Sequence, residues 1–227
     1  MSGTSASIFI QEFQTEVQVC QQLVVVPQIW YYDGFGGGVI ANVPPASQTP
    51  TAIESATTGI RAPIVNFNNR ADNYSARIQG FIKPTISGAY TFYCSSDDAS
   101  RFSLGLAGGT IASAIPIITN AGYTGGPGVS GNNSAVINLV AAQLYPFEAI
   151  YSEGGGGDYI QVDWSGPVGG RQVVPSSVLS ASGSSSSVRK VYRTTRTDAN
   201  GIQTFTYRLV DGTIVTPTLA EPIVDCP

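Results

Sequence analysis

The sequence predicts an all-β protein, namely an antiparallel β-sandwich with a β arm at each end of the chain. Short runs in which apolar and polar residues alternate occur throughout, for example YSARIQGFI, RFSLGL and YIQVDW. Clusters of glycine, proline, asparagine and serine separate these runs, and the periodicity of amphipathic helices is nearly absent. Many short strands bounded by turns are typical of sandwiches and barrels.

The first element, residues 1–27, is predicted to be an N-terminal β arm because IFIQEFQTEVQVCQQLVVV has strand-like alternation. The segment has neither a basic start nor an apolar run that suits a signal peptide. If Met1 is the natural start, we therefore expect synthesis in a cytoplasm without export by this route. No apolar run approaches the 18 or so residues of a membrane-spanning helix, so no membrane partner is expected.

The sandwich itself is expected to span residues 28–180. The stretch 51–63 is the least strand-like part and is expected to be loop or a short helix. Five strands are predicted from the clearest alternation, at 74–83, 89–95, 101–105, 145–151 and 159–164. Cys94 lies in one of them among aromatic residues, which predicts a buried free thiol.

Residues 181–188 form a serine-rich segment that predicts a flexible linker, and 189–227 form the C-terminal β arm. Asn-Gly and Asp-Gly pairs at Asn200 and Asp211 predict tight hairpins in that arm. Isolated hairpins are marginal in water. We therefore expect the two arms to pack on each other, as a small second module, or on partner subunits. Cys20 and Cys226 could form a disulfide, but the sequence does not decide this.

The composition of the chain excludes several classes of function. Only 11% of the residues are charged, against about 25% in an average domain, and the net charge is −4. The densest basic stretch contains Arg189, Lys190, Arg193 and Arg196. We predict that it forms one solvated strand face, and we do not expect nucleic acid as a partner. Histidine is absent, which removes histidine-based triads and most zinc sites. The glycines of GFGGGV, residues 34–39, are expected to form a turn.

Two adjacent carboxylates, Asp97 and Asp98, stand at a predicted strand end in this charge-poor chain. Ca²⁺ takes 6–8 oxygen ligands, and neighbouring aspartates face one ion if the peptide between them is cis. The alternative is a polar β-turn in which Asp97 caps backbone N–H groups. The residues alone leave both interpretations open.

A second stretch, YPFEAIYSEGGGGDYIQVDW, places four glycines between two predicted strands. Glycine is used where the backbone approaches something closely or takes a positive φ. The loop after Glu153 is therefore either the second half of a calcium shell or a slack hairpin loop.

Three ordered motifs resemble the PA14 domain, the carbohydrate-binding β-sandwich of adhesins and flocculins. The resemblance covers residues 28–179, and many members carry glycine where this chain has Ala99. The matching segments are YSARIQGFIKPTISGAYTFYCSSDDASRFSLG, LYPFEAIYSEGGGGDYIQVDW and SGPVGGRQVVPSSVL.

The resemblance implies a Ca²⁺ site and a glycan partner. Adhesin-type members bind the ion through an Asp-Asp pair joined by a cis peptide, which Asp97 and Asp98 match. Glu153 and the backbone carbonyls of Gly154 and Gly155 would supply the second loop's ligands. Two sugar hydroxyls would complete the shell, so Asp97, Asp98 and Glu153 are the expected carbohydrate-binding residues.

The flanking arms contain TEVQVC near the start and RTTRTDANGIQTFTYRLVDGTIVTPTLAEPIVDCP at the end, and these segments resemble β modules of tailed-phage virion proteins. We therefore predict a non-enzymatic virion surface or tail protein that displays a glycan-binding domain for host attachment, with its arms on other virion subunits or on copies of itself. The alternatives are a secreted or cell-surface adhesin fragment and a capsid or tail decoration protein without ligand. A glycosidase is disfavoured because nothing in the sequence indicates a second carboxylate across a cleft.

Overall fold

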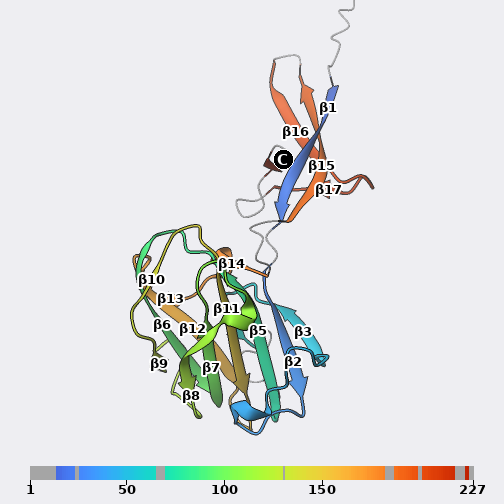
Figure 1. Cartoon of the computed structure of the whole chain (residues 1–227). Coiled ribbons are helices and arrows are strands. Elements are labelled where there is room, and N and C mark those ends of the chain that lie inside the picture. Colours follow the sequence, from blue (N-terminus) through green and yellow to red (C-terminus); the bar gives the residue numbers. More distant parts are fainter. Residues whose placement is uncertain are drawn as a thin grey trace, which may run out of the picture. The chain divides into compact units, whose positions relative to one another are not determined.

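We describe a computed structural model of the chain that consists of two compact units (Figure 1). One unit contains Met1–Val24 and Ser186–Pro227, and the other contains Val25–Ser185. The residues that the structure describes are 14–23, 26–64, 70–129, 131–181, 187–198, 201–217 and 223–224.

The large unit contains two antiparallel sheets. The first sheet has the order β3-β2-β5-β11-β7-β8, with β14 beside β5. Its strands are β2 (Gln28–Asp33), β3 (Ala52–Ser55), β5 (Tyr74–Ile82), β7 (Ala99–Leu104), β8 (Ile115–Asn120), β11 (Tyr145–Ser152) and β14 (Leu179–Ser180).

The second sheet has the order β10-β6-β12-β13, with β4 beside β12 and β9 beside β6. Its strands are β4 (Arg61–Ala62), β6 (Gly88–Asp97), β9 (Asn132–Asn133), β10 (Ile137–Leu139), β12 (Tyr159–Gly166) and β13 (Gly169–Val173). Three short 3₁₀ helices complete the unit, at Ile40–Asn42, Ile111–Ser113 and Ser176–Val178. No helix among the described residues is both long and apolar enough to span a membrane.

All five predicted strands are present, as β5, β6, β7, β11 and β12. The expectation of loop or short helix for 51–63 was wrong, because this stretch contributes β3 and β4. Both strands are short and owe their conformation to a neighbour, since β3 pairs with β2 and β4 pairs with β12. Pairing with a distant strand is a tertiary effect that alternation within 51–63 does not reveal.

The core lies between the two sheets and is rich in aromatic residues. Phe92 of the second sheet packs on Phe102 of the first, with ring centroids 5.4 Å apart, and Trp164 lies beside Phe92 at 6.3 Å. Cys94 is buried in this core as a free thiol, as predicted. Burial raises the pKa of the Cys94 thiol to about 12, because the thiolate would lose its hydration.

The small unit is one antiparallel sheet with the order β17-β16-β15-β1-β18. Its strands are β1 (Gln14–Leu23), β15 (Ser187–Thr197), β16 (Gln203–Arg208), β17 (Ile214–Val215) and β18 (Ile223–Val224). β1 and β15 pair along their length, from Gln14 opposite Arg196 to Leu23 opposite Ser187. The prediction that the two arms pack on each other is therefore confirmed.

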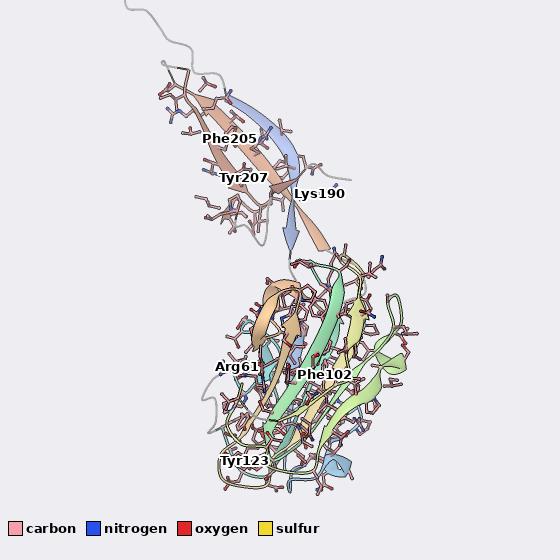
Figure 2. The ribbon with its side chains drawn as sticks, turned by 90° about the vertical axis from the view of Figure 1, so that its left-hand side faces the viewer. Arg61, Phe102, Tyr123, Lys190, Phe205 and Tyr207 are labelled. Atoms are coloured by element: carbon pink, nitrogen blue, oxygen red, sulfur yellow. The ribbon has the colours of Figure 1, made fainter. Side chains whose placement is uncertain are left out.

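Val19, Val191 and Val215 form the buried cluster of this sheet. Lys190 and Arg193 do not share one face, contrary to the prediction for the basic stretch, because strand side chains alternate with a period of two. Lys190 falls on one face, whereas Arg193 falls on the other and lies over the ring of Phe205 at 5.7 Å (Figure 2).

Cys226 and residues 182–186 of the predicted linker lie outside the described residues, so the Cys20–Cys226 pairing stays a prediction.

Candidate metal centre

The chain crosses from one sheet to the other at the Asp97–Asp98 pair. Asp97 ends β6 and lies opposite Tyr159 of β12 in the second sheet. Ala99 begins β7 and lies opposite Ser152 of β11 in the first sheet. The peptide between the two aspartates is cis, as the resemblance implied. Both carboxylates therefore stand at the corner where the two sheets are joined.

The register of β11 places Glu153 at this corner. Because Ser152 lies opposite Ala99, the next residue, Glu153, reaches the carboxylate of Asp98. One ligand oxygen from each of Asp97, Asp98 and Glu153 lies within 4.8 Å of the other two. The three predicted side chains are thus brought together by strands that are far apart in sequence.

Glu153 is fully buried, yet neither of its carboxylate oxygens has a hydrogen-bond partner among the described residues. Burial, together with the nearby charges of Asp98 and Asp97, raises its pKa to about 8. Burial and the Asp98 charge also raise the pKa of Asp97. The ion pairs found among the described residues involve none of these three carboxylates. Such a cluster repels itself unless protons or a cation neutralise it.

The glycine loop after Glu153 closes one side of the cluster. The Gly154 N–H donates a 3.0 Å hydrogen bond to Oδ2 of Asp98. The Gly154 carbonyl accepts a 3.2 Å hydrogen bond from the Asn73 N–H, so one of its two lone pairs is already used. Gly155 is exposed and lies beside Asp72, whose carboxyl carbon would be 3.8 Å from a Cβ placed on Gly155.

A second glycine loop, residues 34–39, which was predicted to be a turn, packs directly against the site. A Cβ on Gly38 would lie 2.9 Å from Oδ2 of Asp98, and one on Gly36 would lie 2.1 Å from the Glu153 carbonyl oxygen. The Gly37 N–H donates a 2.8 Å hydrogen bond to that same carbonyl. The signal that could have shown this is the run of three glycines that begins two residues after the aromatic strand QIWYYD.

Asp158 is a further carboxylate near the site that sequence reasoning missed. Its oxygens accept hydrogen bonds from the backbone N–H groups of Arg70 and Ala71 and from the Tyr74 hydroxyl, at 2.7–3.0 Å. Its charge also contributes to the raised pKa values of Asp97 and Glu153. The Asp158 carboxylate is therefore satisfied by protein donors and fixes the backbone at Arg70 and Ala71. The Glu153 carboxylate has no such donor among the described residues.

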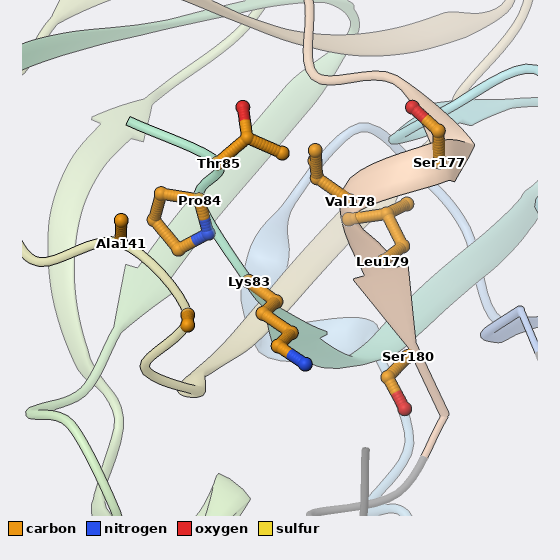
Figure 3. A pocket seen from close by; sticks show the side chains of 9 residues that line it. Lys83, Pro84, Thr85, Ala141, Ser177, Val178, Leu179 and Ser180 are labelled. Carbon is orange, nitrogen blue, oxygen red and sulfur yellow. The ribbon is translucent and has the colours of Figure 1, made fainter. Parts of the chain in front are cut away.

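The opposite end of the sandwich carries a cavity of about 410 Å³ (Figure 3). β5 begins at Tyr74, beside the metal centre, and ends at Ile82, next to this cavity. Lys83 and Pro84 line the cavity together with Ala141 and Leu179. None of its lining residues carries a carboxylate, so its chemistry differs from that of the metal centre.

Solved structures share the fold of the large unit. The PA14 sugar-binding domain of an RTX adhesin is 14% identical, with a TM-score of 0.52, and the match covers 70% of this chain and all of that one (100%). The Epithelial Adhesin 6 A domain of Candida glabrata, solved with Galβ1-3GlcNAc, is 14% identical with a TM-score of 0.51, over 71% of this chain and 89% of that one. At this identity the likeness concerns the fold alone.

An anti-sigma factor domain-containing protein also matches, with 20% identity and a TM-score of 0.50 over 70% of this chain. The chain spans about half of that protein's length (49%). A search of curated protein sequences found no match.

The family model of the PA14 domain matches residues 62–177, which is more than half of the chain. The matched segment runs from β4 to the last 3₁₀ helix and contains Asp97, Asp98 and Glu153. Together with the two-sheet architecture, this match shows that the chain belongs to the PA14 domain family.

Proposed function

We propose that the large unit is a non-enzymatic module that binds a cell-surface glycan through Ca²⁺. The observation that carries the proposal is the carboxylate of Glu153. It is completely buried, accepts no hydrogen bond from any described residue, and lies within reach of Asp97 and Asp98. An unpaired buried carboxylate is costly, and a bound cation removes that cost.

The donor set fits a hard divalent cation. Asp97, Asp98 and Glu153 offer carboxylate oxygens, and the proposed further ligands are the carbonyls of Gly154 and Gly155. Calcium prefers such oxygen ligands and tolerates irregular geometry. Gly38 and Gly154 leave the Asp98 carboxylate room that a side chain would occupy. Three carboxylates and one Ca²⁺ sum to a charge of about −1, which is compatible with a neutral sugar.

A bound Ca²⁺ would accept two vicinal sugar hydroxyls in place of water. The chain's own part is to hold the carboxylates and to leave the outer side open. Gly155 and Gly156 are exposed at this rim and have no side chain to block a sugar. The adhesin domain of Candida glabrata named above was solved with Galβ1-3GlcNAc, which supports a glycan as the ligand.

We further propose that the small unit attaches the glycan-binding module to a larger particle, in the first place the surface or tail of a virion. The support comes from the resemblance of the arm sequences to phage virion modules. The two ends of the chain also meet in one five-stranded sheet, separate from the glycan-binding unit. An extracellular or cell-surface adhesin is the alternative location, with the same glycan-binding site.

Calorimetric titration of calcium into chelator-treated full-length protein tests the metal. We expect saturable binding of one ion and a calcium-dependent rise in melting temperature, with magnesium binding more weakly. Absence of both effects would show that the carboxylates are neutralised by protons alone.

A glycan array probed with calcium and again with excess chelator tests the ligand. Binding only in the presence of calcium supports the proposal. Calcium binding without any glycan binding would instead favour a decoration protein whose metal is structural.

A further inference from the structure

Both glycine loops of the metal centre start at the same edge of the first sheet. β2 is followed by the 34–39 loop, and β11 is followed by the loop that contains Glu153 and Gly154. β5 lies between these two strands and runs antiparallel to both (Figure 1). The chain therefore enters β5 between the two loops, and Asn73 is the last residue before that strand.

Asn73 is hydrogen-bonded to both loops. Its carbonyl accepts a 2.8 Å hydrogen bond from the Gly34 N–H, and its own N–H donates to the Gly154 carbonyl at 3.2 Å. Its side chain adds a third bond, in which Oδ1 accepts from the Gly36 N–H at 3.2 Å. One residue thus joins two loops that follow strands on opposite sides of β5.

The backbone of Asn73 takes a conformation that few side chains tolerate. Its φ is +53°, and Ala142 is the only other non-glycine residue with a positive φ in the described part of the chain. Asparagine enters this left-handed region more readily than most residues. The backbone just before it is fixed by Asp158, which binds the N–H groups of Arg70 and Ala71. A conformation held in this way is a reason to look for a role at a functional site.

The hydrogen bonds of Asn73 reach the carboxylates through the two loops. The Gly154 N–H donates to Oδ2 of Asp98 at 3.0 Å, and the Gly37 N–H donates to the Glu153 carbonyl at 2.8 Å. Both donors belong to loops that Asn73 holds. A shift of either loop would therefore move a group that contacts a proposed ligand residue.

We propose that Asn73 is a positioning residue of the metal centre, which fixes the spacing of the two glycine loops and acts through them rather than as a ligand. This inference rests on the proposed function. Hydrogen bonds around the ligands of an ion set the ligand positions before the ion arrives, and their loss weakens binding. Asn73 is exposed, so its replacement leaves the core of the sandwich intact.

The test uses three substitutions in the full chain. Asn73→Gly removes the side-chain acceptor but tolerates a positive φ, Asn73→Ala also adds backbone strain, and Asn73→Asp keeps an acceptor oxygen. The control is Ser87→Ala, which removes another side-chain acceptor of a loop amide, the 2.8 Å bond from the Ala141 N–H. Ser87 precedes β6, whereas Asp97 ends it, so this loop is remote from the ion.

Calorimetry measures the calcium affinity of the folded protein, and thermal melts in chelator measure the stability without metal. Amide hydrogen exchange at Gly37 and Gly154 in chelator reports how firmly the loops are held, independently of any charge that Asn73→Asp adds. We expect calcium affinity to fall about tenfold in Asn73→Gly and at least as much in Asn73→Ala, with faster exchange at both glycines. Asn73→Asp should keep wild-type exchange and bind calcium no more weakly than the wild type. Ser87→Ala should match the wild type in calcium affinity and in exchange at both glycines.

Wild-type calcium affinity in Asn73→Gly and Asn73→Ala, even with lowered melting temperatures, would reduce Asn73 to a structural residue and overturn the proposal while the metal centre stands. An equal loss of calcium affinity in Asn73→Asp or in Ser87→Ala would overturn it as well. Absence of calcium binding by the wild type would overturn the proposed function, and the positioning role with it.

Discussion

Two glutamates, one in the middle of β11 and one directly after its last residue, differ in how their charges are satisfied. Glu148 accepts hydrogen bonds from Arg77, Gln79 and Arg101, with Gln79 at 2.7 Å and Arg101 at 3.4 Å. Glu153, five positions further along the chain, is more deeply buried and has no partner among the described residues. The chain thus neutralises one buried carboxylate with its own side chains and leaves the other beside two further carboxylates.

The difference separates a charge that the sheet itself pairs from a charge that the proposed cation would pair. Pairing with two arginines makes Glu148 part of the sheet's own hydrogen-bonded network. Glu153 adds nothing comparable to the folded state by itself, because burial and its neighbours raise its pKa to about 8. A buried carboxylate that has no partner among the described residues and stands beside two further carboxylates is the feature on which the proposed cation site rests.

The largest expected effect comes from Glu153→Gln. The substitution removes one negative charge a few ångströms from the proposed ion and should weaken calcium binding about a thousandfold, or ~4 kcal/mol. The metal-free protein should be no less stable than the wild type, because an unpaired buried charge has been removed. Calorimetry with calcium and thermal melts in chelator measure the two quantities. Wild-type calcium affinity in this variant would remove Glu153 from the metal centre.

Glu148→Gln should produce the opposite pattern. It leaves the nearly buried guanidinium of Arg77 without a full counter-charge, and we expect the free energy of unfolding to fall by about 3 kcal/mol. Calcium affinity of the folded protein should stay unchanged. Urea unfolding in chelator, followed by calcium titration below the unfolding transition, gives both values. A weakened calcium affinity would mean that the two glutamates are coupled, which would break the comparison.

A smaller effect is expected from Gly38→Ala, with Gly34→Ala as its matched control. Both glycines have a positive φ, +68° and +81°, so both substitutions add backbone strain of about 1 kcal/mol. Only at Gly38 would the new Cβ meet Oδ2 of Asp98, at 2.9 Å, whereas nothing lies within 4 Å at Gly34. We therefore expect calcium affinity to fall about tenfold in Gly38→Ala alone. Equal calcium affinity in the two variants would show that the Gly38 contact is irrelevant to the ion.

A further prediction concerns the pH dependence of stability in the metal-free protein. The pKa of Glu153 is raised in the folded state to about 8 from an ordinary value of 4.5. Its favourable contribution is therefore complete below about pH 4.5 and is lost as the pH rises through 8. The melting temperature in chelator should decline over this window relative to that of Glu153→Gln, which lacks the titrating group. Parallel melting profiles of the two proteins would contradict the raised pKa.

Local patterns predicted much of the fold. The five clearest strands follow from period-two alternation, which depends only on neighbouring residues. Cys94 was recognised as buried for the same reason, since it alternates with polar residues among aromatics. The short strands β3 and β4 escaped prediction because their conformation depends on pairing with β2 and β12.

The candidate site was partly visible in the sequence. Asp97, Asp98 and Glu153 were identified from unusual local patterns and the family resemblance, and the structure brings them together. The roles of Gly38 and Asp158 were not predicted. Each acts through a contact with a residue more than 50 positions away in the chain, and no local pattern reports such a contact.

By itself the sequence determined the all-β class. It also determined that Asp97 and Asp98 stand side by side and that glycines allow the backbone to approach closely. These features depend only on residue type and short-range order. The tertiary structure decided which buried carboxylate is satisfied. Glu148 meets Arg77 and Gln79 because β11 pairs with β5, and Glu153 meets Asp98 because β11 also pairs with β7. Charge compensation is a property of neighbours in space, and strand register alone assigns those neighbours.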